Sequence, residues 1–215
     1  TKECLSGNKI INSSNFSIVM KTVFFASLLH MVVLNAQKYE PKWSDLDSRP
    51  TPPWFKDAKF GIFIHWGLYS VPAWGPLGSY AEWYLNGLLN GDTNRIKYHN
   101  ENYGKDFLYR DFAQLFNPKK YDPSEWAKLF QLSGAKYVVL TSKHHDGFCL
   151  WPSEHSNGYN SFDTPAKRDL LGDLNKAVRD KGLKSGFYYS LYEWQHPDYP
   201  SNVAAYVNNY MLPQF

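Results

Sequence analysis

The chain has 215 residues, of which 43% are hydrophobic and 20% are charged, and its formal net charge at pH 7 is +3. A chain of this length and hydrophobic content can bury a folded core, which excludes an intrinsically disordered protein. The near-neutral charge argues against a protein that binds nucleic acid or an anionic membrane surface through electrostatic attraction.

The first 37 residues differ from the rest of the chain. Residues 1–19 show no helical or strand period, and we expect an upstream leader that is not part of the native protein. From Met20, a basic residue and an apolar stretch ending in small residues predict a secretory signal peptide over residues 20–37. An uncleaved anchor is the alternative, but the stretch is short for a membrane span and no stop-transfer pattern follows it. We therefore expect a protein of the secretory pathway, lysosomal or extracellular, without stable membrane insertion.

Three later segments share the pattern of a buried strand that ends in polar or aromatic residues. They are residues 58–67, 136–148 and 183–194, and the proline- and tryptophan-rich residues 39–55 before them are expected to form an ordered loop or cap. Continuous apolar, β-branched runs are typical of strands that are covered on both faces of a parallel sheet.

Two helices are predicted between the strands. Asp122 is a plausible N-cap for a helix that ends near Gly134, and its apolar residues Trp126, Leu129, Phe130 and Leu132 are expected to share one face. A second helix over residues 169–182 is expected to turn four residues inward: Leu170, Leu174, Ala177 and Val178.

Alternating strands and helices with short connections predict parallel pairing and right-handed crossovers, and a (β/α) barrel is the natural closure. Only about three strands are visible, whereas a complete eight-stranded barrel typically needs about 250 residues. We therefore expect an α/β fold in which residues 38–215 form the N-terminal part of a (β/α)8-like barrel that is incomplete in this chain.

Several catalytic classes are disfavoured by the motifs. The chain has no phosphate-binding glycine loop, no dinucleotide fingerprint and no Gly-x-Ser-x-Gly elbow. A metal site is disfavoured because adjacent residues on a strand, such as His144 and His145, point to opposite faces and would not both bind one ion. Cys149 is the single cysteine outside the leader, so no disulfide framework is predicted within this chain.

The remaining candidate side chains lie at strand ends or in the Gly- and Trp-rich loop after the first strand. They are imidazoles, a carboxylate, indoles and a phenol: His65, Trp66, Glu82, Trp83, His144, His145, Tyr188 and Trp194. Such a set supplies directional hydrogen bonds and a stacking plane, which neutral polyol ligands need.

Five motifs in order together resemble the α-L-fucosidases of glycoside hydrolase family 29. The motifs are the segments 60–67, 80–84, 143–148, 167–170 and 188–194, within a resemblance that covers residues 39–215. The resemblance implies a (β/α) barrel followed by a C-terminal β-sandwich, which we expect to lie outside this chain. It also implies hydrolysis of terminal α-linked fucose with retention of configuration, a fucosylated glycan as the substrate, and no cofactor or metal.

The resemblance assigns substrate-binding roles to residues of these motifs. His65, Glu82, His144, His145 and Tyr188 would bind fucose hydroxyls, and Trp83 would pack beside the sugar, with Tyr188 preferred to its neighbour Tyr189. Asp146 and Glu193 are expected to shape turns at the strand ends instead of reacting.

A retaining glycosidase needs two carboxylates about 5 Å apart. In the family the nucleophile is an aspartate at the end of a later strand, so both catalytic carboxylates are expected after Phe215. We expect a fragment that binds fucose but is inactive. Two alternatives stay open, namely a lectin-like, non-catalytic fucose-binding protein and a barrel enzyme with a metal-activated water; homo-oligomerisation is also left open.

Overall fold

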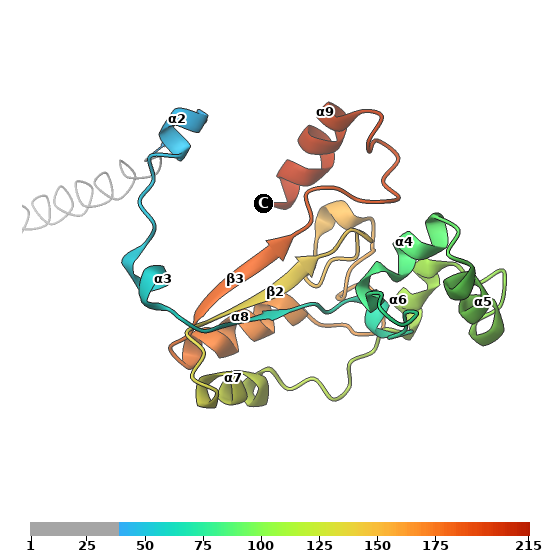
Figure 1. Cartoon of the computed structure of the whole chain (residues 1–215), viewed down its shortest axis with the longest axis horizontal. Helices are drawn as coiled ribbons and strands as arrows, with labels where there is room; N and C mark the ends of the chain where they lie inside the picture. Colours follow the sequence, from blue (N-terminus) through green and yellow to red (C-terminus); the bar gives the residue numbers. More distant parts are fainter. Residues whose placement is uncertain (1–38) are drawn as a thin grey trace, which may run out of the picture. The chain divides into compact units, whose positions relative to one another are not determined.

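The computed structural model describes residues 39–215, so the predictions for residues 1–19 and 20–37 lie outside the described residues. Chain contacts define two compact units, Thr1–Pro52 and Pro53–Phe215. The described segment of the first unit contains a short helix, α2 (Trp43–Leu46). The other described helices and all described strands belong to the second unit (Figure 1). Within residues 39–215, no helix is long and apolar enough to cross a membrane.

A parallel three-stranded sheet organises the second unit (Figure 1). Its strands are β1 (Gly61–Ile64), β2 (Tyr137–Lys143) and β3 (Lys184–Tyr189), in the order β1-β2-β3. Both strand pairs are parallel, as predicted. The carboxyl ends of the three strands therefore meet at one edge of the sheet. The open parallel sheet with helical crossovers confirms the predicted fold class, the N-terminal part of a (β/α)8-like barrel.

Two helices, α7 (Pro123–Leu132) and α8 (Leu170–Asp180), connect the strands and pack beside each other (Figure 1). Both begin where the sequence predicted, because the side chains of Asp122 and Asp169 accept hydrogen bonds from backbone N–H groups of the first turn. The four residues of α8 that were predicted to face inward are all buried: Leu170, Leu174, Ala177 and Val178.

The predicted apolar face of α7 is only partly correct. Trp126 and Phe130 pack against the core, and Ala127 is fully buried. Leu129 and Leu132, however, are 64% and 74% exposed. The prediction was wrong for these two leucines because the helix turns its Trp126–Ala127–Phe130 side toward the core, and positions 129 and 132 lie outside that stripe.

The chain between β1 and β2 forms a helical group that the sequence did not predict. Its helices are α4 (Tyr84–Leu89), α5 (Thr93–Asn102) and α6 (Phe112–Leu115). Phe112 lies at the centre of an aromatic cluster, with the Tyr103 ring 4.8 Å from its own. Three 3-10 turns adjoin these helices: η1 (Leu68–Ser70), η2 (Ala81–Trp83) and η3 (Tyr109–Asp111).

Short helical turns occur in the loop between β2 and α8 and in the segment after β3. They are η4 (Glu154–Ser156), α9 (Val203–Tyr206), the π-helical turn η5 (Val207–Met211) and η6 (Leu212–Gln214). Residues 203–214 are therefore helical, over α9, η5 and η6. Tyr206 of α9 is buried, which ties this segment to the second unit.

The second face of the sheet is more open. Three residues in register occupy it: Phe63, Val139 and Gly186. At the amino ends of the strands, the short helix α3 (Pro53–Asp57) places the rings of Trp54 and Phe55 at 6.2 and 5.7 Å from that of Tyr137. This contact is the part of the predicted proline- and tryptophan-rich cap that belongs to the second unit.

Candidate active site

Side chains at the carboxyl ends of all three strands converge. His65 follows β1, His144 follows β2, and Tyr188 lies near the end of β3. The ring centroids of His65 and His144 are 5.7 Å apart, and the Tyr188 ring lies 6.2 Å from each of them. The structure thus brings three of the predicted site residues into one cluster, which we call the strand-end cluster.

Two tryptophans and a second histidine extend the strand-end cluster. Trp83, on η2, lies 6.4 Å from the ring of His145 and 5.4 Å from that of Trp194. Trp194, in the loop after β3, lies 5.0 Å from the His145 ring and 5.8 Å from the His144 ring. Trp83, His145 and Trp194 therefore contact one another, and His145 and Trp194 also contact His144.

The two adjacent histidines do not point to opposite faces, which corrects the sequence prediction. Their ring centroids are 4.9 Å apart. The reason is that β2 ends at Lys143, so strand alternation no longer applies to His144 and His145. Trp66, by contrast, packs in the core with its ring 4.9 Å from Tyr121, and it is not part of the strand-end cluster. Within residues 39–215, no group of three histidine, cysteine, aspartate or glutamate side chains could hold a metal ion.

Glu82 directly precedes Trp83 on η2, and its charge is one of those that act on the buried Tyr69. Burial raises the pKa of Tyr69 well above its ordinary value, and the negative charges of Asp146 and Glu82 raise it further. The Tyr69 ring lies 5.3 Å from the His144 ring. Five of the six predicted binding residues are thus joined by ring contacts, and the sixth, Glu82, is the chain neighbour of Trp83 on η2.

A buried arginine fixes the segment that leads into η2. Arg95, on α5, is 2% exposed, and its Nη2 donates to Ser79 Oγ at 2.5 Å and to the Tyr80 carbonyl at 2.9 Å. Its Nε pairs with the Asp92 carboxylate at 3.1 Å. Gly87 permits this arrangement, because a Cβ at that position would collide with the arginine side chain. No local pattern predicts this role, since Arg95 is one of two cations, with Lys97, in a polar helical segment.

His144 is neutral and has an unused nitrogen. Burial, reinforced by the neighbouring His145 and His65, lowers the pKa of His144 to about 3. Its Nδ1 is buried and has no hydrogen-bond partner within residues 39–215. Buried polar atoms are nearly always hydrogen-bonded, so an unpartnered nitrogen inside a cluster of polar side chains suits a ligand hydroxyl.

His145 has a defined tautomer. Its Nδ1 lies 3.0 Å from the Tyr192 carbonyl oxygen, which can only accept, so Nδ1 carries the hydrogen. Burial lowers the pKa of His145, which keeps the ring neutral near pH 7 and leaves Nε2 as an acceptor. His145 therefore presents its second nitrogen as an acceptor of hydrogen bonds.

The carboxylates nearest the strand ends are engaged with the protein. Asp146 accepts hydrogen bonds from Tyr109 Oη at 2.6 Å and from the Phe148 N–H at 3.2 Å, and burial raises its pKa to about 6. Its contact with Phe148 is the turn-forming role that the sequence suggested. Glu193 is buried and forms an ion pair with Lys143. The sequence did not predict this ion pair, because the two residues are 50 positions apart.

Comparison with known proteins supports the resemblance in the motifs. The sequence profile of the family described as Alpha-L-fucosidase matches residues 27–214. The Alpha-L-fucosidase of Dictyostelium discoideum is 47% identical over 188 residues, which are 85% of this chain and 40% of that protein. The Tissue alpha-L-fucosidase of Rattus norvegicus is 50% identical over 161 residues, which are 75% of this chain and 34% of that protein.

Solved structures agree with the sequence comparison. The Thermotoga maritima alpha-fucosidase in complex with fucose matches with a TM-score of 0.70 and 47% identity, covering 78% of this chain and 42% of that one. An alpha-L-fucosidase from Bacteroides thetaiotaomicron matches with a TM-score of 0.56 and 38% identity, covering 70% of this chain and 32% of that one. The chain thus spans less than half the length of these relatives. With a profile match over most of the sequence and close agreement in fold, the chain belongs to the α-L-fucosidase family.

Proposed function

We propose that this chain is the fucose-binding part of a retaining exo-α-L-fucosidase that releases terminal α-linked L-fucose from glycoproteins, glycolipids or oligosaccharides. The observation that carries the proposal is the strand-end cluster, with its neutral imidazoles and the unpartnered Nδ1 of His144. The Thermotoga maritima relative that matches with a TM-score of 0.70 was crystallised in complex with fucose.

The chemistry of the cluster suits a neutral sugar. Each hydroxyl of a sugar both donates and accepts a hydrogen bond, and neutral imidazoles offer acceptors without the cost of burying a charge. In this proposal His65, His144, His145 and Tyr188 bind hydroxyls, together with Glu82. Trp83 packs beside the apolar edge of the sugar ring, because an indole offers a flat apolar surface within an otherwise polar site.

Hydrolysis needs two further groups. A retaining mechanism requires a nucleophile and an acid/base about 5 Å apart. Asp146 and Glu193 are both buried and satisfied by neighbouring side chains, so we assign them structural roles. We place the nucleophilic aspartate and the acid/base after Phe215 in the parent protein, and the chain by itself then binds fucose without cleaving glycosides.

The test is hydrolysis of an aryl α-L-fucoside by the full-length parent protein and, in parallel, by the 215-residue chain. The proposal predicts release of the phenol with the parent protein and no release above background with the chain alone. Fucose binding by the parent protein without any hydrolysis would support the lectin-like alternative instead. Loss of hydrolysis on treatment with a chelator would support a metal-dependent enzyme and contradict the proposed mechanism.

The proposed cellular location is the secretory pathway, either the lysosome or the extracellular space. It is supported by the signal peptide predicted over residues 20–37 and by a relative named Plasma alpha-L-fucosidase, from Homo sapiens, which is 45% identical over 180 residues. Expression of the parent gene with a C-terminal tag tests this, because the proposal requires tagged protein that starts near residue 38 in lysosomes or in the medium. Tagged protein in the cytosol that retains residues 20–37 would contradict it.

A further inference from the structure

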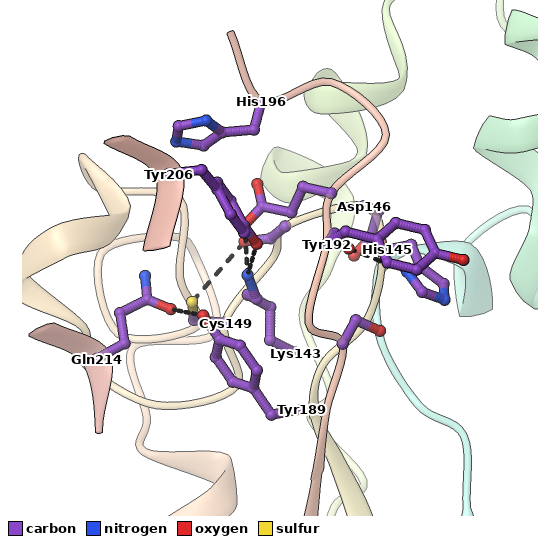
Figure 2. A network of polar contacts seen from close by, with 12 residues as sticks. Lys143, His145, Asp146, Cys149, Tyr189, Tyr192, His196, Tyr206 and Gln214 are labelled. Atoms are coloured by element: carbon purple, nitrogen blue, oxygen red, sulfur yellow. Dashed lines mark hydrogen bonds and ion pairs between the residues drawn. The ribbon is translucent and has the colours of Figure 1, made fainter. Parts of the chain in front are cut away.

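A buried lysine–glutamate pair is formed by the chain neighbours of two residues of the site, since Lys143 precedes His144 and Glu193 precedes Trp194. Lys143, the last residue of β2, is fully buried, and its Nζ forms an ion pair with the Glu193 carboxylate. Aromatic rings surround the ammonium group, with Tyr189 at 4.3 Å and Tyr210 at 4.8 Å from Nζ to the ring centroid. Figure 2 shows the Lys143 side chain close to those of Tyr189 and Tyr206. Tyr206 Oη lies 3.4 Å from Lys143 Nζ.

Stability alone does not account for such a pair. Removing two charges from water is expensive, and replacing a buried ion pair with apolar side chains of similar size is often neutral or stabilising. Burial by itself lowers the pKa of Lys143, and the charge of Glu193 opposes this effect. A pair that adds little net stability can still determine where two segments lie relative to each other.

The pair joins the two loops that carry the cluster. The loop after β2 holds His145, and the loop after β3 holds Tyr192 and Trp194. Between them, the Ser190 N–H donates to the Lys143 carbonyl and the Trp194 N–H donates to the His145 carbonyl, both at 2.9 Å. His145 Nδ1 meets the Tyr192 carbonyl at 3.0 Å. The ion pair is the ionic link in this set of interloop contacts.

Glu193 also packs closely against the backbone of the loop after β2. Gly147 has a φ of +81°, and a Cβ there would run into the Glu193 carboxyl group. The carboxylate thus lies directly over the turn that follows the two histidines, between that turn and the lysine. A shift of Glu193 would move the loop after β3, which carries Trp194.

We propose that Lys143 and Glu193 are positioning residues, whose ion pair holds the loop after β3 against the loop after β2. In this arrangement His145 keeps its hydrogen on Nδ1 for Tyr192 and presents Nε2 to the sugar, and Trp194 stays against both histidines. The inference rests on the proposed function, because the groups that are positioned are the proposed fucose ligands. Neither residue touches the sugar.

The experiment compares four variants of the full-length parent protein with wild type. Glu193→Gln and Lys143→Met each leave one partner of the pair unmatched, and the double variant removes both charges. The matched control is Asp180→Asn, which removes the carboxylate of the exposed Lys176–Asp180 pair on α8. Three quantities are measured for each protein: the thermal unfolding midpoint, the dissociation constant for L-fucose by calorimetry, and the His145 tautomer by long-range heteronuclear NMR without ligand.

Both single variants are expected to unfold at lower temperature, because each leaves a buried charge without its partner. The double variant is expected to regain most of this stability, yet to bind L-fucose about tenfold more weakly than wild type. Its His145 is expected to show a mixture of tautomers, whereas wild type and Asp180→Asn show the Nδ1–H form. Restored stability together with weakened binding and mixed tautomers would distinguish a role in positioning His145 from a role in stabilising the fold.

A double variant with wild-type affinity and an unchanged His145 tautomer would overturn the inference. This comparison remains possible even if one of the single variants fails to fold. The tautomer is measured without any sugar, so it reports on positioning independently of binding. Absence of L-fucose binding by folded wild-type protein would defeat the proposed function, while the tautomer comparison would still decide whether Lys143 and Glu193 position His145.

Discussion

Replacing His144 with phenylalanine is expected to weaken fucose binding and, at the same time, to stabilise the free protein. The imidazole is 5% exposed and neutral, with a pKa lowered by burial to about 3, and its Nδ1 has no partner among the described residues. Phenylalanine fills a similar volume without ring nitrogens, so His144→Phe removes the polar atoms and leaves no large cavity.

The two effects have opposite signs because the unpartnered nitrogen destabilises the free protein, whereas in the complex it forms a hydrogen bond with the sugar. Leaving a buried acceptor unsatisfied costs about 1–3 kcal/mol, so its removal should stabilise the free protein by about 1 kcal/mol. A sugar hydroxyl that bonds to Nδ1 recovers this energy on binding. Losing that bond should weaken L-fucose binding by about 2 kcal/mol, which is about 30-fold in the dissociation constant.

Calorimetric titration with L-fucose and urea denaturation measure the two effects separately. The matched control is His99→Phe, the same change at a buried histidine whose ring nitrogens contact Tyr84 Oη at 3.1 Å and the Phe107 carbonyl at 2.7 Å. The control should lose stability and keep its affinity. An unchanged dissociation constant for His144→Phe would remove this residue from the site.

Three further substitutions test other parts of the account. Asp146→Asn should flatten the dependence of the unfolding free energy on pH between about 4 and 6. Burial raises the pKa of Asp146 from 3.8 to about 6, so the wild-type protein becomes less stable as the pH rises through this window. Urea unfolding at several pH values measures the slope. Gly147→Ala should lower stability by about 2 kcal/mol, because the φ of +81° and the approach of Glu193 both oppose a side chain; a wild-type melting curve would contradict this. Arg95→Lys should cost about 2 kcal/mol in chemical denaturation, since an ammonium cannot reproduce the planar contacts to Asp92 and the segment before η2, and undiminished stability would refute that role.

Local signals in the sequence were sufficient for the strands and for the two long helices between them. An aspartate N-cap followed by apolar residues at helical spacing marks both α7 and α8, and buried β-branched runs mark β2. The same sequence did not predict α4, α5 and α6. Their aromatic residues pack on one another across the helices, as Tyr84 does on Tyr98 and Phe112, so no single apolar face identifies each helix.

The convergence of several candidate side chains at the strand ends could be predicted from the sequence, whereas their orientation could not. Strand ends and motifs identified His65, His144 and Tyr188, and parallel pairing explains why they meet. The orientation of the neighbouring His145 could not be predicted, because it depends on β2 ending at Lys143. The ion pair between Lys143 and Glu193 was also beyond prediction, since contacts between residues 50 positions apart leave no local pattern.

The central claim, that the strand-end cluster binds fucose, is tested most directly by histidine side-chain NMR of the full-length protein. L-fucose is titrated beside its enantiomer D-fucose, which has the same composition and the opposite handedness. The account predicts that L-fucose shifts the ring signals of His65, His144 and His145 but not that of the buried His99, and that D-fucose shifts none of them. Folded protein whose site histidines do not respond to saturating L-fucose, or respond equally to both enantiomers, would contradict it.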